Sequence, residues 1–397
     1  MEKRLRKKYL RLIEEMNQKS QLRLPAIPAL VDCFAIMMSE EEADFLLAVG
    51  QAHYSVDDLQ RFSKRRGDDW QYFIQRIFAE GFLWMREVHG QQVAELAPIF
   101  PGWIEVALFR KEITPQRLQL LDKFQEILRM EELLNLPPVR MYWTWAKRKK
   151  LEQQPPTMTI AANGGRKKLV LNQKLQSGDS HSVETAGEIQ KLLQQYGTEG
   201  QLALVHCFCR NISRLKGYSC HFHLPLEACI MVGSFAKQMV DYGIGRFITL
   251  EEAQALVQEC QRKGAVHTVF HYGLDTTQPE IGICNCCWDC CCLFGSYNAG
   301  GLSNIAVRAH YKAVLVAPEL CNGCGVCERF CPTLATGFDK AQGQVWLKDE
   351  LCIGCGQCVD KCGRGVRALA AEERDVYTPT LPKHKARNHN FVGSSHA

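Results

Sequence analysis

The sequence predicts an α+β chain of several domains. Its 397 residues are enough for two to four domains. The cysteines are unevenly spread, because only Cys33 precedes residue 200 and the other nineteen lie between Cys207 and Cys362. The cysteine-poor part carries capped helical patterns, and the cysteine-rich part mixes strand and helix patterns. We expect domains at 1–152, 169–310 and 311–370, a linker at 153–168 and a disordered tail at 371–397.

Composition narrows the class of protein. The chain is 46% hydrophobic and 23% charged, which is ordinary for a soluble globular protein, and its net charge of +5 does not by itself imply a nucleic-acid partner. No apolar run reaches the roughly 18 residues that span a bilayer, and no apolar stretch of a signal peptide follows the basic start. We therefore expect a cytoplasmic protein, in which cysteines bind metal rather than form disulfides.

Residues 1–152 predict three helices followed by a hairpin. Ser39 and Glu42 form a capping box for the first helix, Ser55 caps the second, and the hairpin turns at Gly90. The third helix has one apolar face, made by Trp70, Phe73, Ile74, Ile77 and Phe78. This order resembles a winged helix, and a further helix follows, with Thr114 as its cap and Pro115 in its first turn.

Winged helices bind DNA or dock proteins. Here the third helix would be the recognition helix, and its first turn carries Asp68 and Asp69 where phosphates would approach. The residues that could contact bases or backbone are Gln71, Gln75, Arg76, Lys64, Arg65 and Arg66. Because of the acidic entry, DNA binding is the alternative and docking of a protein partner is the favoured prediction.

The middle domain predicts a buried strand, "LALVHCFCRN", that delivers Cys207 and Cys209 to a loop. The stretch "LPLEACIMVGSFAKQMVDYG", which contains Cys229, has helical periodicity. The next helix begins at a capping box of Thr249 and Glu252 and ends at Gly264. We interpret Cys260, like Cys33, as a small buried hydrophobe.

The densest cysteine segment is "ICNCCWDCCC", at 283–292. Cys284, Cys287 and Cys290 have C-x2-C-x2-C spacing, which leaves Cys286, Cys291 and Cys292 over. Side chains of adjacent residues point different ways, so Cys286 and Cys287 should serve different neighbours. The upstream candidates for completing a site are Cys207, Cys209, Cys220 and Cys229. These thiols predict one further cluster, two clusters, a cluster plus zinc, or a pair of zinc sites.

The last cysteines form two matching runs, "CNGCGVCERFCP" and "CIGCGQCVDKCG". Three thiolates at i, i+3 and i+6 on a tight loop can converge on three corners of a cubane. Gly323 and Gly354 ease the turns and expose backbone N–H groups to the sulfurs. Two zinc knuckles are the alternative, but zinc sites lack this reciprocal spacing.

Residues 311–370 closely resemble bacterial two-cluster ferredoxins. The resemblance implies that cluster one takes Cys321, Cys324, Cys327 and Cys362, and that cluster two takes Cys352, Cys355, Cys358 and Cys331. The last cysteine of the first run, Cys331, is followed by Pro332, as in the family. The chain departs from the family in the second run, where Cys362 is followed by Gly363. Arg364 and Arg367 add positive charge, which should raise the reduction potential of the nearby cluster.

Residues 165–370 also resemble a group of iron–sulfur proteins of anaerobes, described only as 4Fe-4S binding proteins. The resemblance rests on "LVHCFCR", "GRFITLEEA", "GAVHTV" and "ICNCCWDCCC". It implies electron transfer and names no substrate. Trp288-Asp289 stands where this group is expected to have glycine.

The predicted function is one-electron transfer between two [4Fe–4S] clusters and a redox partner protein, with a third Fe–S cluster or zinc in the middle domain. The chain has no dinucleotide-binding glycine motif, no P-loop and no nucleophile elbow, so we expect no stand-alone catalytic activity. Two alternatives remain: a redox-responsive DNA-binding regulator, and an iron–sulfur subunit of a larger oxidoreductase.

Overall fold

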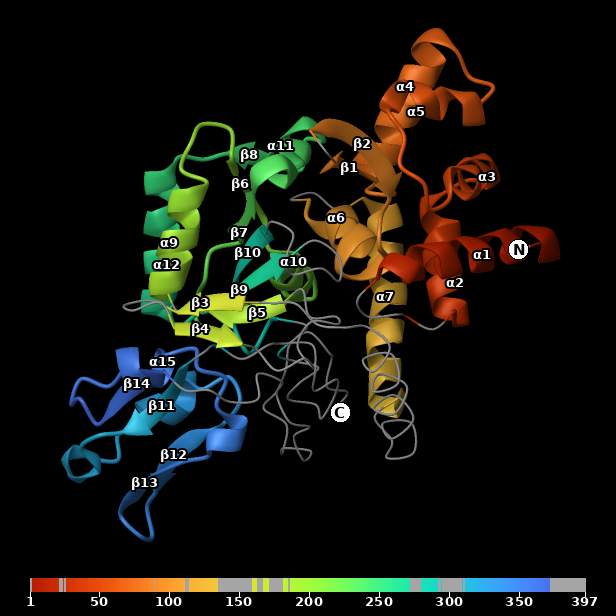
Figure 1. The fold of residues 1–397 in the computed structure, drawn as a ribbon. Helices are drawn as coiled ribbons and strands as arrows, with labels where there is room; N and C mark the ends of the chain where they lie inside the picture. The colour runs from red at the N-terminus through yellow and green to blue at the C-terminus, as the bar shows by residue number, and fades with distance from the viewer. Residues whose placement is uncertain are drawn as a thin grey trace.

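Figure 1 shows the fold of the protein as a computed structural model. It describes residues 2–20, 24, 26–88, 90–110, 114–134, 159–162, 167–170, 181–184, 186–271, 280–291, 294, 309 and 311–371. Most of the expected linker, the whole tail beyond residue 371 and Cys292 lie outside these residues. Within them, no helix combines the length and the apolar character that a membrane crossing requires.

The N-terminal part is mostly helical and contains one hairpin. Its long and medium helices are α1 (Lys3–Lys19), α2 (Pro28–Met37), α3 (Glu40–Val49), α5 (Gly67–Ala79) and α7 (Pro115–Leu134). Its short helices are α4 (Val56–Leu59), η1 (Gln60–Phe62), η2 (Ile99–Trp103) and α6 (Ile104–Leu108). The hairpin pairs β1 (Leu83–Val88) with antiparallel β2 (Gln91–Leu96).

The local signals of this part are present in the structure. Ser39 and Glu42 form the reciprocal capping box of α3, and the hydroxyl of Ser55 accepts from the amide of Asp58 at the start of α4. All five apolar residues expected on one face of α5 are buried. Tyr54 forms a bridge to Ala94 of β2, so the segment between α3 and α4 adds to the hairpin. The resemblance to a winged helix remains a prediction.

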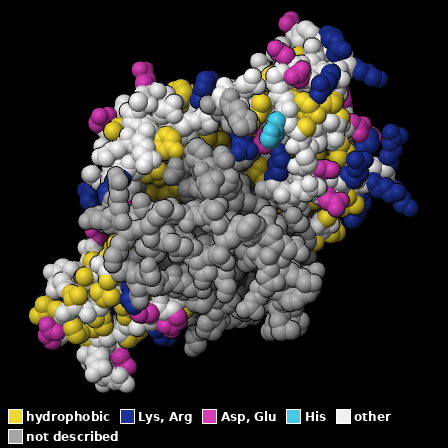
Figure 2. All heavy atoms as spheres, viewed as in Figure 1, with side chains coloured by type: hydrophobic (Ala, Val, Ile, Leu, Met, Phe, Trp, Pro, Cys, Tyr) yellow, Lys and Arg dark blue, Asp and Glu magenta, His cyan; other side chains and the backbone are white. Residues whose placement is uncertain are grey.

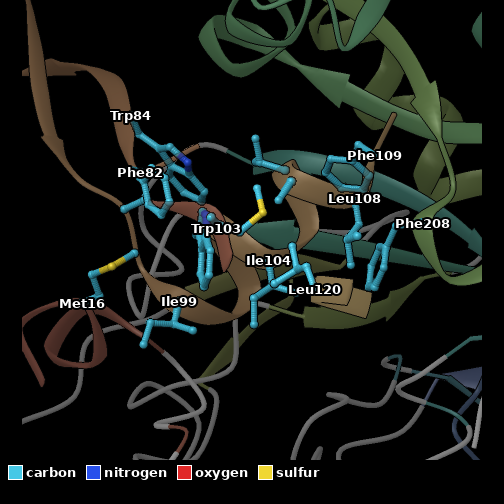
Figure 3. Close-up of a cluster of buried hydrophobic side chains, with 14 of the residues drawn as sticks. Met16, Phe82, Trp84, Ile99, Trp103, Ile104, Leu108, Phe109, Leu120 and Phe208 are labelled. Atoms are coloured by element: carbon cyan, nitrogen blue, oxygen red, sulfur yellow. The ribbon is translucent and has the colours of Figure 1, made fainter. Parts of the chain in front are cut away.

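One hydrophobic core joins the N-terminal part to the middle domain. Figure 3 shows its centre, where Trp103 is fully buried and stacks on Phe82 at 5.1 Å between ring centroids. At its edge, Phe109 meets Phe208 edge-to-face at 5.9 Å. Phe208 lies between Cys207 and Cys209 in the sequence, so the N-terminal part packs directly against a cysteine-bearing turn.

Glu105 in this core gives a pH-dependent prediction. Its carboxylate accepts from the amide of Gly102 at 2.7 Å, but burial raises its pKa from 4.5 to about 8. Because the pKa of Glu105 is higher in the folded protein than in the unfolded chain, protonation of Glu105 stabilises the fold. This stabilisation is fully present below pH 4.5 and is lost as the pH rises through about 8, and the free energy of unfolding falls by about 1.4 kcal/mol per pH unit.

We expect Glu105→Gln to remove this dependence. Urea unfolding, followed by tryptophan fluorescence, measures the midpoint of each protein. From pH 6 to pH 8 the midpoint of the variant should rise relative to that of wild type. The exposed Glu41→Gln is the control and should not show this trend. A midpoint difference that stays constant across this range would contradict the assignment.

The middle domain contains an antiparallel sheet of six described strands in the order β5-β9-β10-β7-β6-β8. The strands are β5 (His181–Glu184), β6 (Leu202–His206), β7 (Glu227–Val232), β8 (Gly245–Phe247), β9 (Val266–His271) and β10 (Glu280–Cys286). Apolar side chains of α9 (Ala186–Gln195) and α12 (Leu250–Lys263) pack on one face. The helices α10 (Phe208–Leu215) and α11 (Gly233–Asp241) lie on the other (Figure 1). A separate hairpin pairs β3 (Thr159–Ala162) with β4 (Lys167–Val170).

Three local expectations for this domain were wrong in part. The stretch around Cys229 begins as strand β7 and becomes helical only at Gly233, because a fully buried strand lacks the alternation that would reveal it. Cys207 occupies the non-helical N-cap position between β6 and α10, as expected, but Cys209 lies in the first turn of α10 and not in a loop. α12 begins after Thr249 and ends at Gly264 as expected, and the Thr249 hydroxyl accepts from the amide of Glu252. The carboxylate of Glu252, however, binds Arg246 instead of closing the capping box.

The C-terminal domain is built from one pair of antiparallel strands at its two ends, one short hairpin and repeated turns. β11 (Tyr311–Leu315) pairs with β14 (Arg367–Ala371), and β12 (Thr336–Asp339) pairs with β13 (Gln344–Leu347). Each cysteine run follows a 3-10 turn, η4 (Pro318–Leu320) or η5 (Asp349–Leu351), and leads into a short helix, α14 (Val326–Phe330) or α15 (Gln357–Asp360).

This domain docks on the middle domain through side chains next to its cysteines. The ring of Phe330 stacks on Phe222 at 5.2 Å between centroids. Gly264, left-handed at φ +107°, ends α12 and leaves room for that ring, because a Cβ there would lie 2.5 Å from it. The buried amide of Gln357 donates to the side-chain oxygen of Gln261 at 2.9 Å. Residues that directly precede Cys331 and Cys358 therefore form the interface.

Candidate metal centres

The two cysteine runs of the C-terminal domain adopt the same local structure. In each run two glycines flank the second cysteine: Gly323 and Gly325 in the first run, and Gly354 and Gly356 in the second. All four have a left-handed backbone, with φ between +69° and +78°, which favours glycine. Gly354 is the most constrained, since a Cβ there would lie 2.0 Å from the carbonyl oxygen of Tyr311. These turns bend the backbone inward around each loop.

A small cavity lies beside the second run. All four cysteines that the ferredoxin resemblance assigns to cluster two line it: Cys331, Cys352, Cys355 and Cys358. Backbone amides point at two of these sulfurs, since Ala335 donates to Cys331 at 3.1 Å and Ala313 donates to Cys352 at 3.5 Å. The donor set, the apolar lining and the amide donors all fit a [4Fe–4S] cluster.

The cysteines assigned to cluster one lie nearer the surface. Cys327 is buried, Cys321 and Cys362 are partly exposed, and Cys324 is exposed. Burial raises the pKa of Cys362, but amides of residues 364–366 and the charge of Arg367 outweigh burial and lower it. Arg367 is itself buried and bonded to Thr336. It therefore brings positive charge close to Cys362, one of the cysteines assigned to cluster one.

Six cysteines of the middle domain form a continuous series of thiol contacts, here called the six-thiol group. In order of contact they are Cys209, Cys207, Cys229, Cys284, Cys286 and Cys291. The sulfurs of Cys229 and Cys284 lie 3.6 Å apart, because these residues are directly paired across β7 and β10. Five of the six side chains are buried. The group lies on the face of the sheet that carries α10.

Protons are shared unequally in the six-thiol group. Hydrogen bonds from the Cys209 and Cys229 thiols hold the pKa of Cys207 well below its ordinary value, and the charge of Arg210 acts in the same direction. Contacts with Cys229 and Cys286 hold the pKa of Cys284 well above its ordinary value. A metal bound here requires thiolates, so binding must release the remaining protons.

A second and more compact group, here called the compact group, consists of Cys220, Cys287, Asp289 and Cys290. Its four ligand atoms all lie within 4.8 Å of one another, and all four side chains are buried. Within the described residues, no other set of His, Cys, Asp and Glu side chains is gathered so closely.

The cysteines of "ICNCCWDCCC" belong to two different groups, and the division does not follow the C-x2-C-x2-C spacing. Cys284 and Cys286 belong to strand β10, where side chains two residues apart share a face, and both join the six-thiol group. Cys287 and Cys290 follow the strand and join Cys220 in the compact group. Cys284, Cys287 and Cys290 thus do not converge on one site.

Two residues that the sequence reasoning did not assign to a site stand beside these thiols. Asp289 contributes to the compact group, and its acidic side chain in place of glycine was the available signal. Arg210 is 4% exposed and donates to the backbone oxygen of Asn285 at 3.0 Å and toward the sulfur of Cys287 at 3.8 Å. Nothing in the sequence marked Arg210, because it lies 77 residues from Cys287.

No histidine lies in the compact group of ligand atoms. The ring nitrogens of His267 are within hydrogen-bond distance of Asn285 and Gln261, at 2.7 and 2.9 Å. Burial lowers the pKa of His267 to about 4. His221 takes part through its backbone, whose amide donates to Asp289 at 2.6 Å.

Comparison with known proteins identifies the C-terminal segment. Residues 313–363 match the family model described as a 4Fe-4S dicluster domain. No curated protein and no solved structure matches the chain. The chain therefore carries a 4Fe-4S dicluster domain that includes all eight cysteines of its two C-terminal runs.

Proposed function

We propose that this protein is an iron–sulfur electron carrier that passes single electrons to or from a partner oxidoreductase. The observation that carries the proposal is the dicluster domain, in which Cys331 joins Cys352, Cys355 and Cys358 around one cavity. A [4Fe–4S] cluster, when bound, supplies one-electron transfer between its +2 and +1 states. The protein supplies the thiolates, the amide donors and the positive charge that set the potential.

The arrangement of the domain supports a route for electron passage. The exposed Cys324 places cluster one near the surface, where a partner protein can approach. The cluster-two side faces inward, because Phe330 and Gln357 dock on the middle domain. The six-thiol group is the candidate site of a third cluster, since its sulfurs extend as a series rather than converging on one ion.

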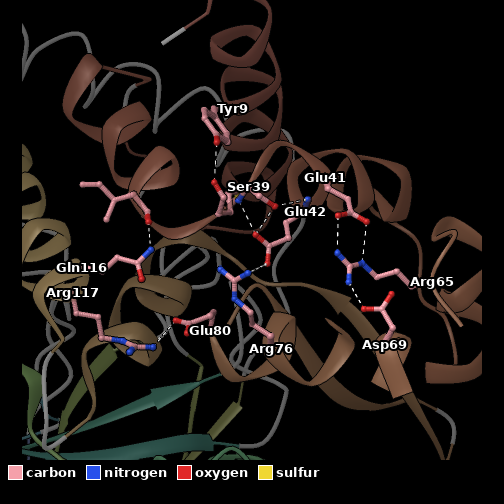
Figure 4. A network of polar contacts seen from close by, with 12 residues as sticks. Tyr9, Ser39, Glu41, Glu42, Arg65, Asp69, Arg76, Glu80, Gln116 and Arg117 are labelled. Carbon is pink, nitrogen blue, oxygen red and sulfur yellow. Dashed lines mark hydrogen bonds and ion pairs between the residues drawn. The ribbon is translucent and has the colours of Figure 1, made fainter. Parts of the chain in front are cut away.

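Docking of a protein is favoured over DNA binding for the N-terminal part. Figure 4 shows Arg65 donating to Glu41 at 2.8 Å and bonded to Asp69, and Arg76 paired with Glu42 at 2.7 Å. These acidic partners occupy the guanidinium groups that phosphates and bases would need. Lys and Arg side chains gather instead over α1, at the edge of the molecule in Figure 2, where they could bind an acidic partner surface.

The test is the metal content of the full-length protein purified without oxygen. Two clusters predict about eight irons and eight labile sulfides per chain, and a third predicts about twelve. Cys229→Ala should then lower iron from about twelve to about eight, because it breaks the middle of the six-thiol series. Electron paramagnetic resonance of the reduced protein should show the spins of the remaining clusters.

Cys33→Ala is the matched control, since Cys33 is buried but lies outside both groups and burial raises its pKa to about 12. Its iron content should equal that of wild type. An iron content near four in folded wild-type protein would contradict the two-cluster proposal. Salt-sensitive, sequence-selective retardation of DNA by the same protein would favour the regulator instead.

A further inference from the structure

We propose that Cys220, Cys287, Asp289 and Cys290 form a site for one zinc ion, separate from every iron–sulfur site of the chain. The inference goes beyond the electron-transfer function and does not depend on it. It rests on the spacing of the four ligand atoms, on an unpartnered carboxylate oxygen and on the chemistry of the donors.

The spacing fits one ion rather than a cluster. Four ligands around a tetrahedral zinc with Zn–S bonds of about 2.3 Å place their sulfurs about 3.8 Å apart. The sulfurs of Cys220 and Cys287 lie 3.6 Å apart, and all four ligand atoms lie within 4.8 Å of one another. Thiolates of a cubane bind different irons and must stand farther apart. The ferredoxin cysteines do not gather into so compact a set in the part of the chain that the structure describes.

Asp289 supplies the independent evidence for a ligand. Its side chain is only 2% exposed, and one carboxylate oxygen accepts from the amide of His221. The other oxygen, Oδ1, is buried and has no hydrogen-bond partner among the described residues. A buried carboxylate oxygen without a partner is costly, and three neighbouring thiols make the cost greater when they ionise. A bound cation would satisfy this oxygen.

Donor chemistry favours zinc over the ions that prefer oxygen ligands. Three thiolates exclude magnesium and calcium, which take oxygen ligands. Zinc accepts both thiolate and carboxylate, and four protein ligands without an open position are typical of a structural zinc site. The four ligands carry four negative charges, of which zinc neutralises two, and the guanidinium of Arg210 near Cys287 neutralises part of the rest.

The location gives the ion a structural role. The loop between α10 and β7 contains Cys220 and Phe222, and its residue His223 has a left-handed backbone at φ +49°. A loop with such strain needs an anchor, and the ion would tie it to the turn after β10. Phe222 meets Trp288 edge-to-face and stacks on Phe330, so the same anchor would support the surface on which the C-terminal domain docks.

Zinc, iron and labile sulfide should be measured together in the anaerobically purified full-length protein. We expect about one zinc per chain, with three sulfur neighbours near 2.3 Å and one oxygen near 2.0–2.2 Å in zinc K-edge absorption spectra. Asp289→Ala should weaken retention of zinc against a chelator by about tenfold or more and leave iron and sulfide unchanged. Asp289→Cys should retain zinc with four sulfur neighbours.

Cys260→Ala is the matched control, because Cys260 is buried in the same apolar cluster but lies outside the four ligands, and its zinc content should equal that of wild type. The wild-type spectrum and Asp289→Cys keep the test valid if Asp289→Ala does not fold. Wild-type protein without zinc, a zinc shell without oxygen, or a joint fall of iron and sulfide in Asp289→Ala would overturn the proposal.

Discussion

Gly354→Ala is expected to remove the iron of cluster two, about four of the eight irons of the dicluster domain. The backbone at Gly354 has φ +77°, which costs an alanine about 1–2 kcal/mol. The larger effect is steric, because the new Cβ would lie 2.0 Å from the carbonyl oxygen of Tyr311 and 3.0 Å from Ala309. Neither neighbour can move away without shifting the start of β11. The loop that carries Cys352 and Cys355 must therefore open.

Gly343→Ala separates strain from collision. Gly343, in the turn between β12 and β13, also has a left-handed backbone, at φ +67°, but a Cβ there meets no atom within 4 Å. This control should lose stability by about 1–2 kcal/mol and keep its iron. Iron, labile sulfide and the spin count of the reduced protein measure both variants. If Gly354→Ala retained the full iron content, the turn at Gly354 would not be needed to hold Cys352 and Cys355 in place for cluster two.

Local chemistry made much of the N-terminal part predictable. The capping box at Ser39, the cap at Ser55 and the buried face of α5 depend on residues within one or two turns of helix, and the structure has all three. The two C-terminal cysteine runs were equally readable, because their glycines and cysteines specify a loop of fixed geometry. The match to a 4Fe-4S dicluster domain confirms the iron–sulfur character of that segment.

The middle domain was less predictable because its sites are assembled by a sheet. The spacing of Cys284, Cys287 and Cys290 matches a cluster-binding loop, but Cys284 lies in a strand, where the two-residue period places it with Cys286. The partner of Cys284 is Cys229, 55 residues away, and strand register cannot be derived from either segment alone. Asp289 and Arg210 enter the sites only through that register.

Arg210→Met is expected to destabilise the protein by about 3–5 kcal/mol and to lower the metal content of the middle domain. Burial lowers the pKa of Arg210, but negative charge on the neighbouring cysteines, above all on Cys207, outweighs burial and holds this pKa well above its ordinary value. The guanidinium thus lies between the six-thiol group and the compact group. It also donates to the backbone oxygens of Pro225 and Asn285, which methionine would leave unpaired.

Arg210→Lys tests whether charge or geometry dominates. Lysine keeps the positive charge but cannot reproduce the planar fork that reaches two carbonyls and a sulfur, so it should recover only part of the stability. Urea midpoints followed by tryptophan fluorescence, with zinc and iron counted in the same samples, measure both effects. If Arg210→Met had the stability and metal content of wild type, Arg210 would not be needed to balance the negative charge of the two cysteine groups. If Arg210→Lys were as stable as wild type, the whole stabilising effect of Arg210 would come from its positive charge. The hydrogen bonds to the backbone oxygens of Pro225 and Asn285 would then contribute nothing to stability.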